Sequence, residues 1–447
     1  MAAWSQAGAV IPLRACLDRP TTEVGRKAAV LAWAEAQGLA TPGGVVVPSI
    51  AFRDALAAAG ALGRALYLEQ AALRLDPRHA LSIAASVAPA VEAPGDLAAA
   101  AFAAVDARVA VCRSSAAMED GRQAAFPGVF ASVLGIRSAG RLGQAMTTCW
   151  RSAFSAEAVR YVLRMHVEPV DLSLALLVQP QVAAPWYGAY AGVDPLSGAP
   201  EPCADLSDAA PDAVVGGAPA VVRSRRAGGR WSGVDRRLAA SLEAVHEAAG
   251  LLAAHLGAAV DVEFALPAAG DPMILQCRPL TAVGSSAALP GAAGRPCAGG
   301  RAVGVAGRPG DIAVLERLTT ADYGIVFGHA GVVTEEDASP LGHAAILCRE
   351  LGVPLVCGVA GTRRLIGRRV VVDGGAGTVE PAADGEDAPA ERPRRRRPQV
   401  VITEAELALR VLAEGRPGRP AGAEADRLAR RTARALGTTV VRSTDRV

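Results

Sequence analysis

The chain has 447 residues, enough for two or three domains that each bury a core of their own. Its 51% hydrophobic and 20% charged residues are typical of a globular protein, and the formal net charge of +2 argues against a nucleic-acid partner. No run of ~20 strongly apolar residues predicts a membrane span, and the N-terminus does not resemble a signal peptide, so we expect a cytoplasmic protein without a membrane partner.

The first part of the chain, residues 1–285, alternates apolar runs typical of strands with alanine-rich stretches typical of helices. This alternation predicts a domain of the α/β class. The expected strands are 44–49, 108–115, 174–182, 260–266 and 272–279.

The second part is separated from the first by residues 286–299, whose small, Gly- and Pro-rich sequence predicts a linker. Residues 300–382 predict a small β/α domain that ends in a strand, a turn and a strand. Residues 383–399 are acidic, then basic, with several prolines, which is typical of a disordered linker. Residues 400–447 predict a helical, basic tail.

Lysine use is the most informative feature of the composition. Lys27 is the only lysine, and the remaining 45 of the 46 basic residues are arginine. A lysine retained against this bias indicates a place that needs a compact ammonium, such as a phosphate site. We expect Lys27 in the first turn of a helix that Thr22 or Glu23 caps, with Gly25 allowing close approach of the backbone. The alternative is chance survival on a solvated helix.

A second candidate site follows the predicted strand 108–115. The strand is expected to end on Arg113, Ser114 and Ser115, and a cation beside two hydroxyl groups suits recognition of an oxyanion. A polar turn with a surface salt bridge is the alternative.

The segments 260–266 and 272–279 predict a hairpin about the turn 267–272. A symmetric register pairs Glu263 with Gln276 and Asp261 with Arg278 on one face. This face is either an exposed, salt-bridged surface or a platform for a metal–nucleotide complex, because carboxylate and amide oxygens suit Mg²⁺. The opposite face is expected to carry Val262, Phe264, Leu275 and Cys277.

A histidine lies at the entrance of the helix predicted at 344–351, which Gly352 ends. His343 follows a loop that contains Ser339, and a neutral imidazole is a competent nucleophile. A phosphoryl group on His343 would face the free N–H groups of the helix N-terminus. A capping or core histidine is the alternative, and it is the role we expect for His329.

These segments together resemble the family of phosphoenolpyruvate synthase, pyruvate phosphate dikinase and rifampin phosphotransferase. The similarity spans about 24–280 and 300–382, with six motifs in the family's order. The matching segments are VGRKAAVLAWAEAQGLATPGGVVVP, CRSSAAMED with FPGVF, CWRSAFSAEAVRY, GVDPLSG, DVEFA with ILQCRPLT, and HAAILCRELGVPLVCGV.

The resemblance implies an α+β ATP-grasp module followed by a small β/α swivelling phosphohistidine domain. It implies that Lys27 and Arg113 bind ATP phosphates and that His343 attacks the β-phosphate, with release of AMP and inorganic phosphate. Mg²⁺ would neutralise charge on the phosphate oxygens. By the same resemblance, Glu263 and Gln276 hold the metal–nucleotide complex, and Arg278 clamps phosphate.

The sequence departs from the family at three places. Gly342 replaces the Ser or Thr that usually precedes the histidine, so we expect Ser339 to supply a hydroxyl instead. The glycine-rich segment expected after GVDPLSG is absent, and no acceptor domain is recognisable. We therefore expect phosphotransfer to a small molecule. The alternatives are a donor subunit whose acceptor site lies on a partner protein, and a degenerate nucleotide-binding protein.

Overall fold

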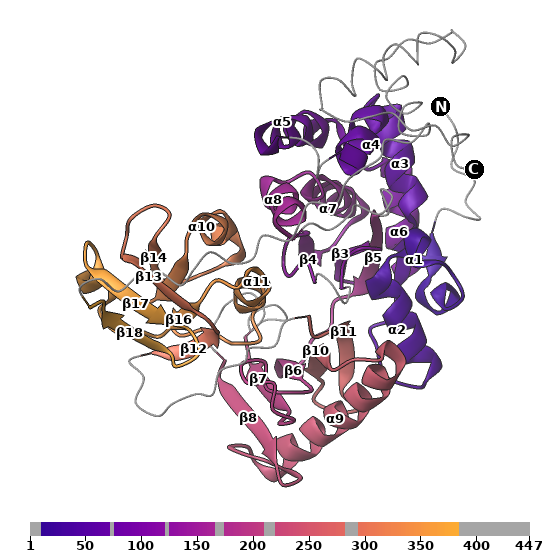
Figure 1. The fold of residues 1–447 in the computed structure, drawn as a ribbon. Coiled ribbons are helices and arrows are strands. Elements are labelled where there is room, and N and C mark those ends of the chain that lie inside the picture. Colours follow the sequence, from indigo (N-terminus) through magenta and orange to yellow (C-terminus); the bar gives the residue numbers. More distant parts are fainter. Residues whose placement is uncertain are drawn as a thin grey trace, which may run out of the picture.

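The computed structural model describes residues 10–71, 76–120, 125–165, 174–209, 220–281 and 294–383 (Figure 1). The predicted linker 383–399 beyond its first residue, the predicted tail 400–447 and most of the predicted linker 286–299 lie outside the described residues. Within the described part, no helix is long and apolar enough to cross a membrane.

The first sheet has the strand order β1-β2-β5-β3-β4, with every pair antiparallel. Helices α3, α6 and α7 pack on one face, and alternate residues of β5 reach the opposite face, which turns toward α2. Its elements are β1 (Ile11–Pro12), α1 (Thr21–Val24), α2 (Arg26–Ala36), β2 (Val45–Val47), α3 (Ser49–Ala58), α4 (Leu62–Ala71), α5 (Pro77–Val87), α6 (Gly95–Val105), β3 (Ala110–Ala116), β4 (Ser132–Ile136), α7 (Ala139–Ser152), α8 (Ala156–Met165) and β5 (Leu174–Pro180).

The second sheet has the order β11-β10-β6-β7-β8-β9 and is also antiparallel. The long helix α9 (Arg236–Leu256) covers one face together with α2 (Figure 1). Gly257 ends α9 in the left-handed conformation, at φ 63°, as the sequence predicts. The strands are β6 (Trp186–Ala191), β7 (Cys203–Ser207), β8 (Val222–Ala227), β9 (Arg230–Trp231), β10 (Val260–Leu266) and β11 (Met273–Pro279).

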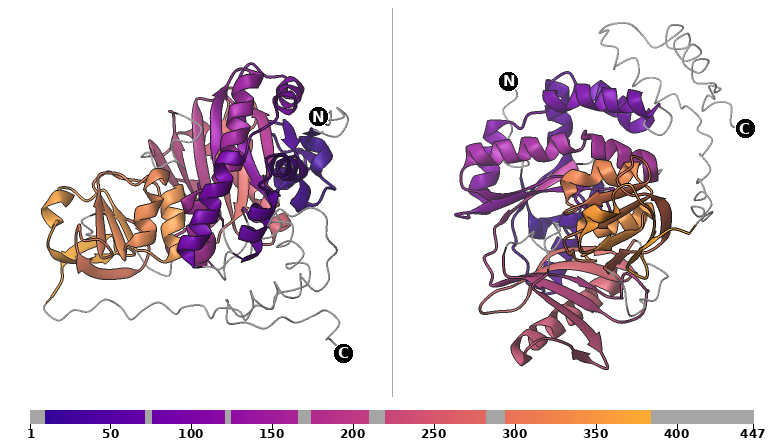
Figure 2. Two further views of the ribbon diagram at one scale, coloured as in Figure 1. Left: turned by 90° about the horizontal axis from the view of Figure 1, so that it is seen from above. Right: turned by 90° about the vertical axis from the view of Figure 1, so that its left-hand side faces the viewer.

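The C-terminal part holds a four-stranded sheet, β12-β16-β15-β14, and a three-stranded sheet, β13-β17-β18. It lies against the open face of the second sheet and the end of the first (Figure 2). Its elements are β12 (Arg295–Ala298), β13 (Arg301–Val305), β14 (Ile312–Leu315), α10 (Tyr323–Gly328), β15 (Gly331–Thr334), α11 (His343–Leu351), β16 (Leu355–Cys357), β17 (Arg369–Asp373) and β18 (Thr378–Pro381).

The linker expected at 286–299 is shorter than the sequence indicates. Residues 295–298 form β12, which pairs antiparallel with β16 and completes the sheet of the C-terminal part. Cys297 and Ala298 are fully buried in the core. Small residues favour a linker in a sequence, but they also fit a strand that packs tightly against its neighbours.

The hairpin β10–β11 confirms the predicted pairs Glu263–Gln276 and Asp261–Arg278. The register shifts after Glu263, where Phe264 pairs with Ile274. This bulge moves Leu275 away from the face expected for it, and it packs with Tyr187 and Ala265 instead.

Candidate active site

The polar face of the hairpin β10–β11 is buried. Asp261, Glu263, Gln276 and Arg278 are only 4, 8, 7 and 3% exposed. The expectation of an exposed, salt-bridged face is therefore wrong. A buried set of two carboxylates, an amide and a guanidinium needs partners for every charge. Those partners come from three other segments of the chain.

Lys27 has a carboxylate partner of its own, outside the hairpin. It lies in the first turn of α2, is 7% exposed and forms an ion pair with the buried Glu119. Glu119 also accepts a hydrogen bond from the backbone N–H of Ala116, at 3.2 Å. The solvated-helix interpretation of Lys27 is therefore wrong. Glu119 was not among the predicted site residues, although it belongs to the segment CRSSAAMED.

The residues expected beside Lys27 have structural roles. Gly25, not Thr22 or Glu23, is the N-cap residue of α2, and no side chain caps the helix. A Cβ on Gly25 would lie 1.8 Å from the carbonyl oxygen of Ser115, so only glycine fits there, at φ 76°. The Ser115 hydroxyl donates to the Val24 carbonyl oxygen at 3.0 Å and accepts from the Ala28 N–H. Ser115 thus anchors the two helices rather than an oxyanion.

Arg113 lies on β3 and faces the hairpin. Its Nη1 is 3.7 Å from an oxygen of Glu263. Its Nε is buried and has no hydrogen-bond partner among the described residues. A buried donor without an acceptor is costly, and a phosphate oxygen would satisfy it.

Asp120 is a second site residue that the sequence analysis missed. It accepts hydrogen bonds from Nε2 of Gln276 at 3.2 and 3.1 Å, and it lies 3.9 Å from Arg278. Burial raises the pKa of Asp120 to about 7, because the nearby Lys27 only partly offsets the loss of solvent. Burial therefore favours the protonated form of Asp120.

Arg278 is held by the protein itself. Its Nε and Nη2 donate to one oxygen of Asp261 at 3.0 and 2.9 Å. Burial opposes its charge, but Asp261, Asp120 and Glu263 raise the pKa of Arg278 above its usual value. The other oxygen of Asp261 is buried and unpaired in the described structure.

His343 comes from the other part of the chain and reaches this site. It is the first residue of α11, after the N-cap residue Gly342. Its Nε2 lies 3.6 Å from an oxygen of Glu263. Burial would raise the pKa of Glu263, but the neighbouring His343 and Arg113 lower it to about 2. The opposite ring nitrogen, Nδ1, faces Gly128, on which a Cβ would lie 2.9 Å away.

The hydroxyl of Ser339 does not donate to His343 as expected. It donates to Asp205 on β7 at 2.6 Å and accepts from the Leu341 N–H. The side chain is thus occupied in joining the loop before α11 to the second sheet. His329 has the structural role that we expected, since its Nδ1 lies 2.8 Å from the carbonyl oxygen of Ile325.

Two groups of polar contacts hold α11 and its loop against the first part of the chain. Glu350, two turns after His343, accepts from the Ala125 N–H at 2.9 Å, from the Thr281 hydroxyl at 2.5 Å and from Tyr161. On the other side, Arg223 of β8 donates to Asp337 at 3.0 Å and to the carbonyl oxygen of Ala338 at 2.9 Å.

A third contact joins the loop 125–130 to α10. Tyr323 of α10 donates to the carbonyl oxygen of Pro127 at 2.8 Å, and Phe126 packs on Tyr161. The loop 125–130 therefore contacts α10, and its Gly128 lies against the ring of His343.

The site fits ATP phosphates and Mg²⁺ by its donor set. Lys27 and the unpaired Nε of Arg113 suit phosphate, and the oxygens of Glu263 and Gln276 suit Mg²⁺. No group of three or more His, Cys, Asp or Glu side chains in the described residues forms a metal site without further ligands. Mg²⁺ would therefore need phosphate oxygens or waters to complete its coordination.

Two family models match the chain, in the order of its two parts. Residues 21–224 match the pyruvate phosphate dikinase AMP/ATP-binding domain, which includes Lys27 and Arg113. Residues 307–377 match the mobile domain of PEP-utilising enzymes, which includes His343. The hairpin β10–β11 lies between the two matched segments.

Known proteins similar to this chain differ in how much of it they cover. A probable phosphoenolpyruvate synthase of Methanothermobacter thermautotrophicus is 27% identical over an alignment of 374 positions, which covers 71% of this chain and 54% of that protein. An uncharacterized protein of Mycobacterium tuberculosis is 37% identical over 86 residues, 19% of this chain and 10% of that protein. The chain thus spans about half the length of the first relative and a tenth of the second.

Among solved structures, the ADP complex of N5-carboxyaminoimidazole ribonucleotide synthetase aligns with 40% of this chain and 36% of its own, at 13% identity and a TM-score of 0.20.

Proposed function

Because the chain belongs to the family of pyruvate phosphate dikinase and phosphoenolpyruvate synthase, with an AMP/ATP-binding domain followed by a mobile domain, we propose that it transfers phosphate from ATP through His343. One observation carries the proposal. Nε2 of His343, on the mobile domain, lies 3.6 Å from Glu263, on the polar face of the hairpin. The nucleophile of one domain and the donor set of the other thus share one site.

In this proposal Nε2 is the attacking nitrogen, because Nδ1 faces Gly128 and has no room for a phosphoryl group. The Nε2 lone pair forms a bond to the β-phosphorus, and the bond from that phosphorus to the oxygen of AMP breaks. The γ-phosphoryl group passes to water or phosphate, and phosphohistidine retains the β-phosphoryl group. The negative charge that develops on the oxygens needs cations that are already in place.

The side chains divide this task. The ammonium of Lys27 has three N–H donors, so it can keep Glu119 and still bind a phosphate oxygen. Arg113 offers its unpaired Nε. Glu263 and Gln276 hold Mg²⁺, which neutralises charge on the phosphates when bound. Arg278 is bound to Asp261, so in this arrangement it orients the hairpin more than it clamps phosphate.

The phosphoryl acceptor is proposed to be a small molecule. The alternative places the acceptor site on a partner protein.

The test uses ATP labelled at the β-phosphate, with Mg²⁺, on the wild type and on His343→Ala. We expect an acid-labile, base-stable label and formation of AMP in the wild type, and neither in the variant. His79→Ala, which removes an exposed histidine on α5, is the matched control and should label normally. Protein that binds ATP but forms neither label nor AMP would refute the proposal and favour the degenerate nucleotide-binding protein.

A further inference from the structure

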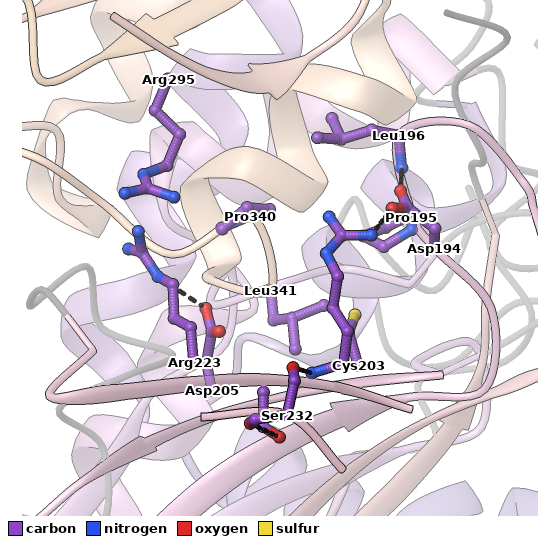
Figure 3. A pocket seen from close by; sticks show the side chains of 12 residues that line it. Asp194, Pro195, Leu196, Cys203, Asp205, Arg223, Ser232, Arg295, Pro340 and Leu341 are labelled. Carbon is purple, nitrogen blue, oxygen red and sulfur yellow. Dashed lines mark hydrogen bonds and ion pairs between the residues drawn. The ribbon is translucent and has the colours of Figure 1, made fainter. Parts of the chain in front are cut away.

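A second cavity lies where the two domains meet, outside the site described above. It has a volume of about 210 Å³ (Figure 3). Strands β7 and β8 and the loop 194–196 form its wall on the ATP-binding domain. Arg295, Pro340 and Leu341 form its wall on the mobile domain. The cavity is complete only while the two domains are docked.

Three arginines line this cavity: Arg223, Arg225 and Arg295. Figure 3 shows the guanidinium groups of Arg223 and Arg295 facing each other. Arg225 pairs with Asp194 through Nη1 alone, and Arg295 donates to Asp337 through Nε alone. Their remaining N–H groups have no acceptor among the residues that the structure describes.

The acidic side chains of the cavity are already satisfied. Asp194 accepts from the N–H groups of Leu196 and Ser197, at 2.8 and 3.1 Å, besides its pair with Arg225. Asp205 accepts from Ser339 and lies 3.5 Å from Nε of Arg223. The cavity therefore offers N–H donors in excess over acceptors, which is the chemistry of an anion site.

The rest of the wall combines apolar residues with Ser224 and Ser232, which are hydrogen-bonded to their neighbours: Ser224 donates to the Ser232 carbonyl oxygen, and the Ser232 hydroxyl accepts from the Arg225 N–H. Leu196, Pro340 and Leu341 contribute hydrocarbon surface. The Pro340 carbonyl oxygen accepts from the buried Arg349 at 2.7 Å, which holds the loop in place. The volume is below the ~300–1,000 Å³ of pockets for drug-sized ligands, so it suits a small anion with few carbon atoms.

We propose that this interdomain pocket binds a small dianion, a phosphate or a dicarboxylate, between Arg225 of the ATP-binding domain and Arg295 of the mobile domain. The ligand binds the docked arrangement, because one of the two arginines leaves when the domains separate. Its binding shifts the population toward the state in which His343 reaches Glu263. The loop that lines the pocket ends at His343, so only a few residues separate the bound anion from the reactive histidine. Binding itself does not depend on the proposed phosphotransfer.

The test measures binding of inorganic phosphate and of malonate by calorimetry, on the full chain. We expect saturable binding of at least one of them. Arg225→Gln and Arg295→Gln should each weaken it by about tenfold, because each removes a charge-assisted hydrogen bond. Arg317→Gln and Arg19→Gln are matched controls, since these arginines are similarly exposed and pair with one carboxylate outside the pocket. Thermal unfolding of each variant checks that it is folded.

Two more variants test whether the anion binds in this pocket rather than at the nucleotide site, and whether its binding depends on domain docking. Arg113→Gln should retain the wild-type affinity for the anion. Loss of affinity in this variant would assign the anion to the nucleotide site and overturn the proposal. Glu350→Ala does not touch the pocket but removes three hydrogen bonds that dock the mobile domain, so it should weaken binding several-fold. Equal affinity in Glu350→Ala would refute the dependence on docking. Absence of binding, or equal affinity in the Arg225 and Arg295 variants, would refute the site.

Discussion

A substitution at Gly128 tests directly whether docking of the mobile domain brings His343 to the ATP site. A Cβ at this position would lie 2.8 Å from Cγ2 of Thr320, 2.9 Å from Nδ1 of His343 and 3.0 Å from the hydroxyl oxygen of Tyr323. All three atoms belong to the mobile domain. Gly128→Ala therefore overpacks the docked interface, and overpacking of this kind costs ~1–3 kcal/mol.

This penalty acts on the reactive ring, because His343 is one of the groups that must move. A cost of ~1–3 kcal/mol corresponds to a fall of ~5- to 150-fold in the rate of His343 phosphorylation. The affinity for ATP should stay unchanged, since the three atoms nearest to the methyl group all belong to the mobile domain. The assay is single-turnover labelling from β-labelled ATP, with nucleotide affinity measured separately by calorimetry.

Backbone strain has to be separated from the clash, because Gly128 has φ 62°. Gly135→Ala is the matched control. Gly135 has φ 73°, but a Cβ there meets no atom within 4 Å. It should bear the same strain and label at the wild-type rate. Equal labelling rates in the two variants, or a slow Gly135→Ala, would refute the argument that the docked arrangement is the reactive one.

Three further predictions concern the buried charges. Lys27→Met should destabilise the fold by ~3–5 kcal/mol, because it leaves Glu119 buried and unpaired. The double variant Lys27→Met with Glu119→Gln should recover stability in urea titrations but should not recover labelling of His343. Recovery of labelling would contradict a role for Lys27 at phosphate. Glu263→Gln should raise the Mg²⁺ concentration needed for half-maximal labelling by at least ~10-fold, and an unchanged Mg²⁺ dependence would remove Glu263 from the metal site. Burial raises the pKa of Asp120 from its ordinary value of 3.8 to about 7. Between these two pH values the folded state binds the proton more tightly than the unfolded state, so the free energy of unfolding of the wild type falls as the pH rises. Relative to the wild type, Asp120→Asn should therefore gain free energy of unfolding as the pH rises through that window, and a constant difference would show that Asp120 titrates normally.

Much of the local structure was predictable because it depends on short-range rules. The pairs Glu263–Gln276 and Asp261–Arg278 followed from a symmetric turn, since side chains alternate along strands. The end of α11 at Gly352 followed from the left-handed conformation that glycine adopts there. The retained lysine indicated a special position for Lys27, and the structure shows it buried against Glu119.

The errors arose where local rules compete with packing. The bulge after Glu263 displaced Leu275, and no residue in the turn predicts this bulge. Ser115 looked like an anion ligand, yet its hydroxyl is consumed by Val24 and Ala28, which are distant in sequence. Ser339 was expected beside His343, but Asp205 of another domain holds its hydroxyl.

By itself, the sequence determined the class of the two domains, the strand and helix on which each candidate residue lies, and the chemistry those residues offer. Only the tertiary structure decided that Asp120 and Glu119 complete the site, that His343 reaches Glu263, and that three arginines converge at a second pocket. The physical reason is one of range. Propensity and periodicity act over a few residues, whereas burial, ionic pairing and domain docking join segments more than a hundred residues apart.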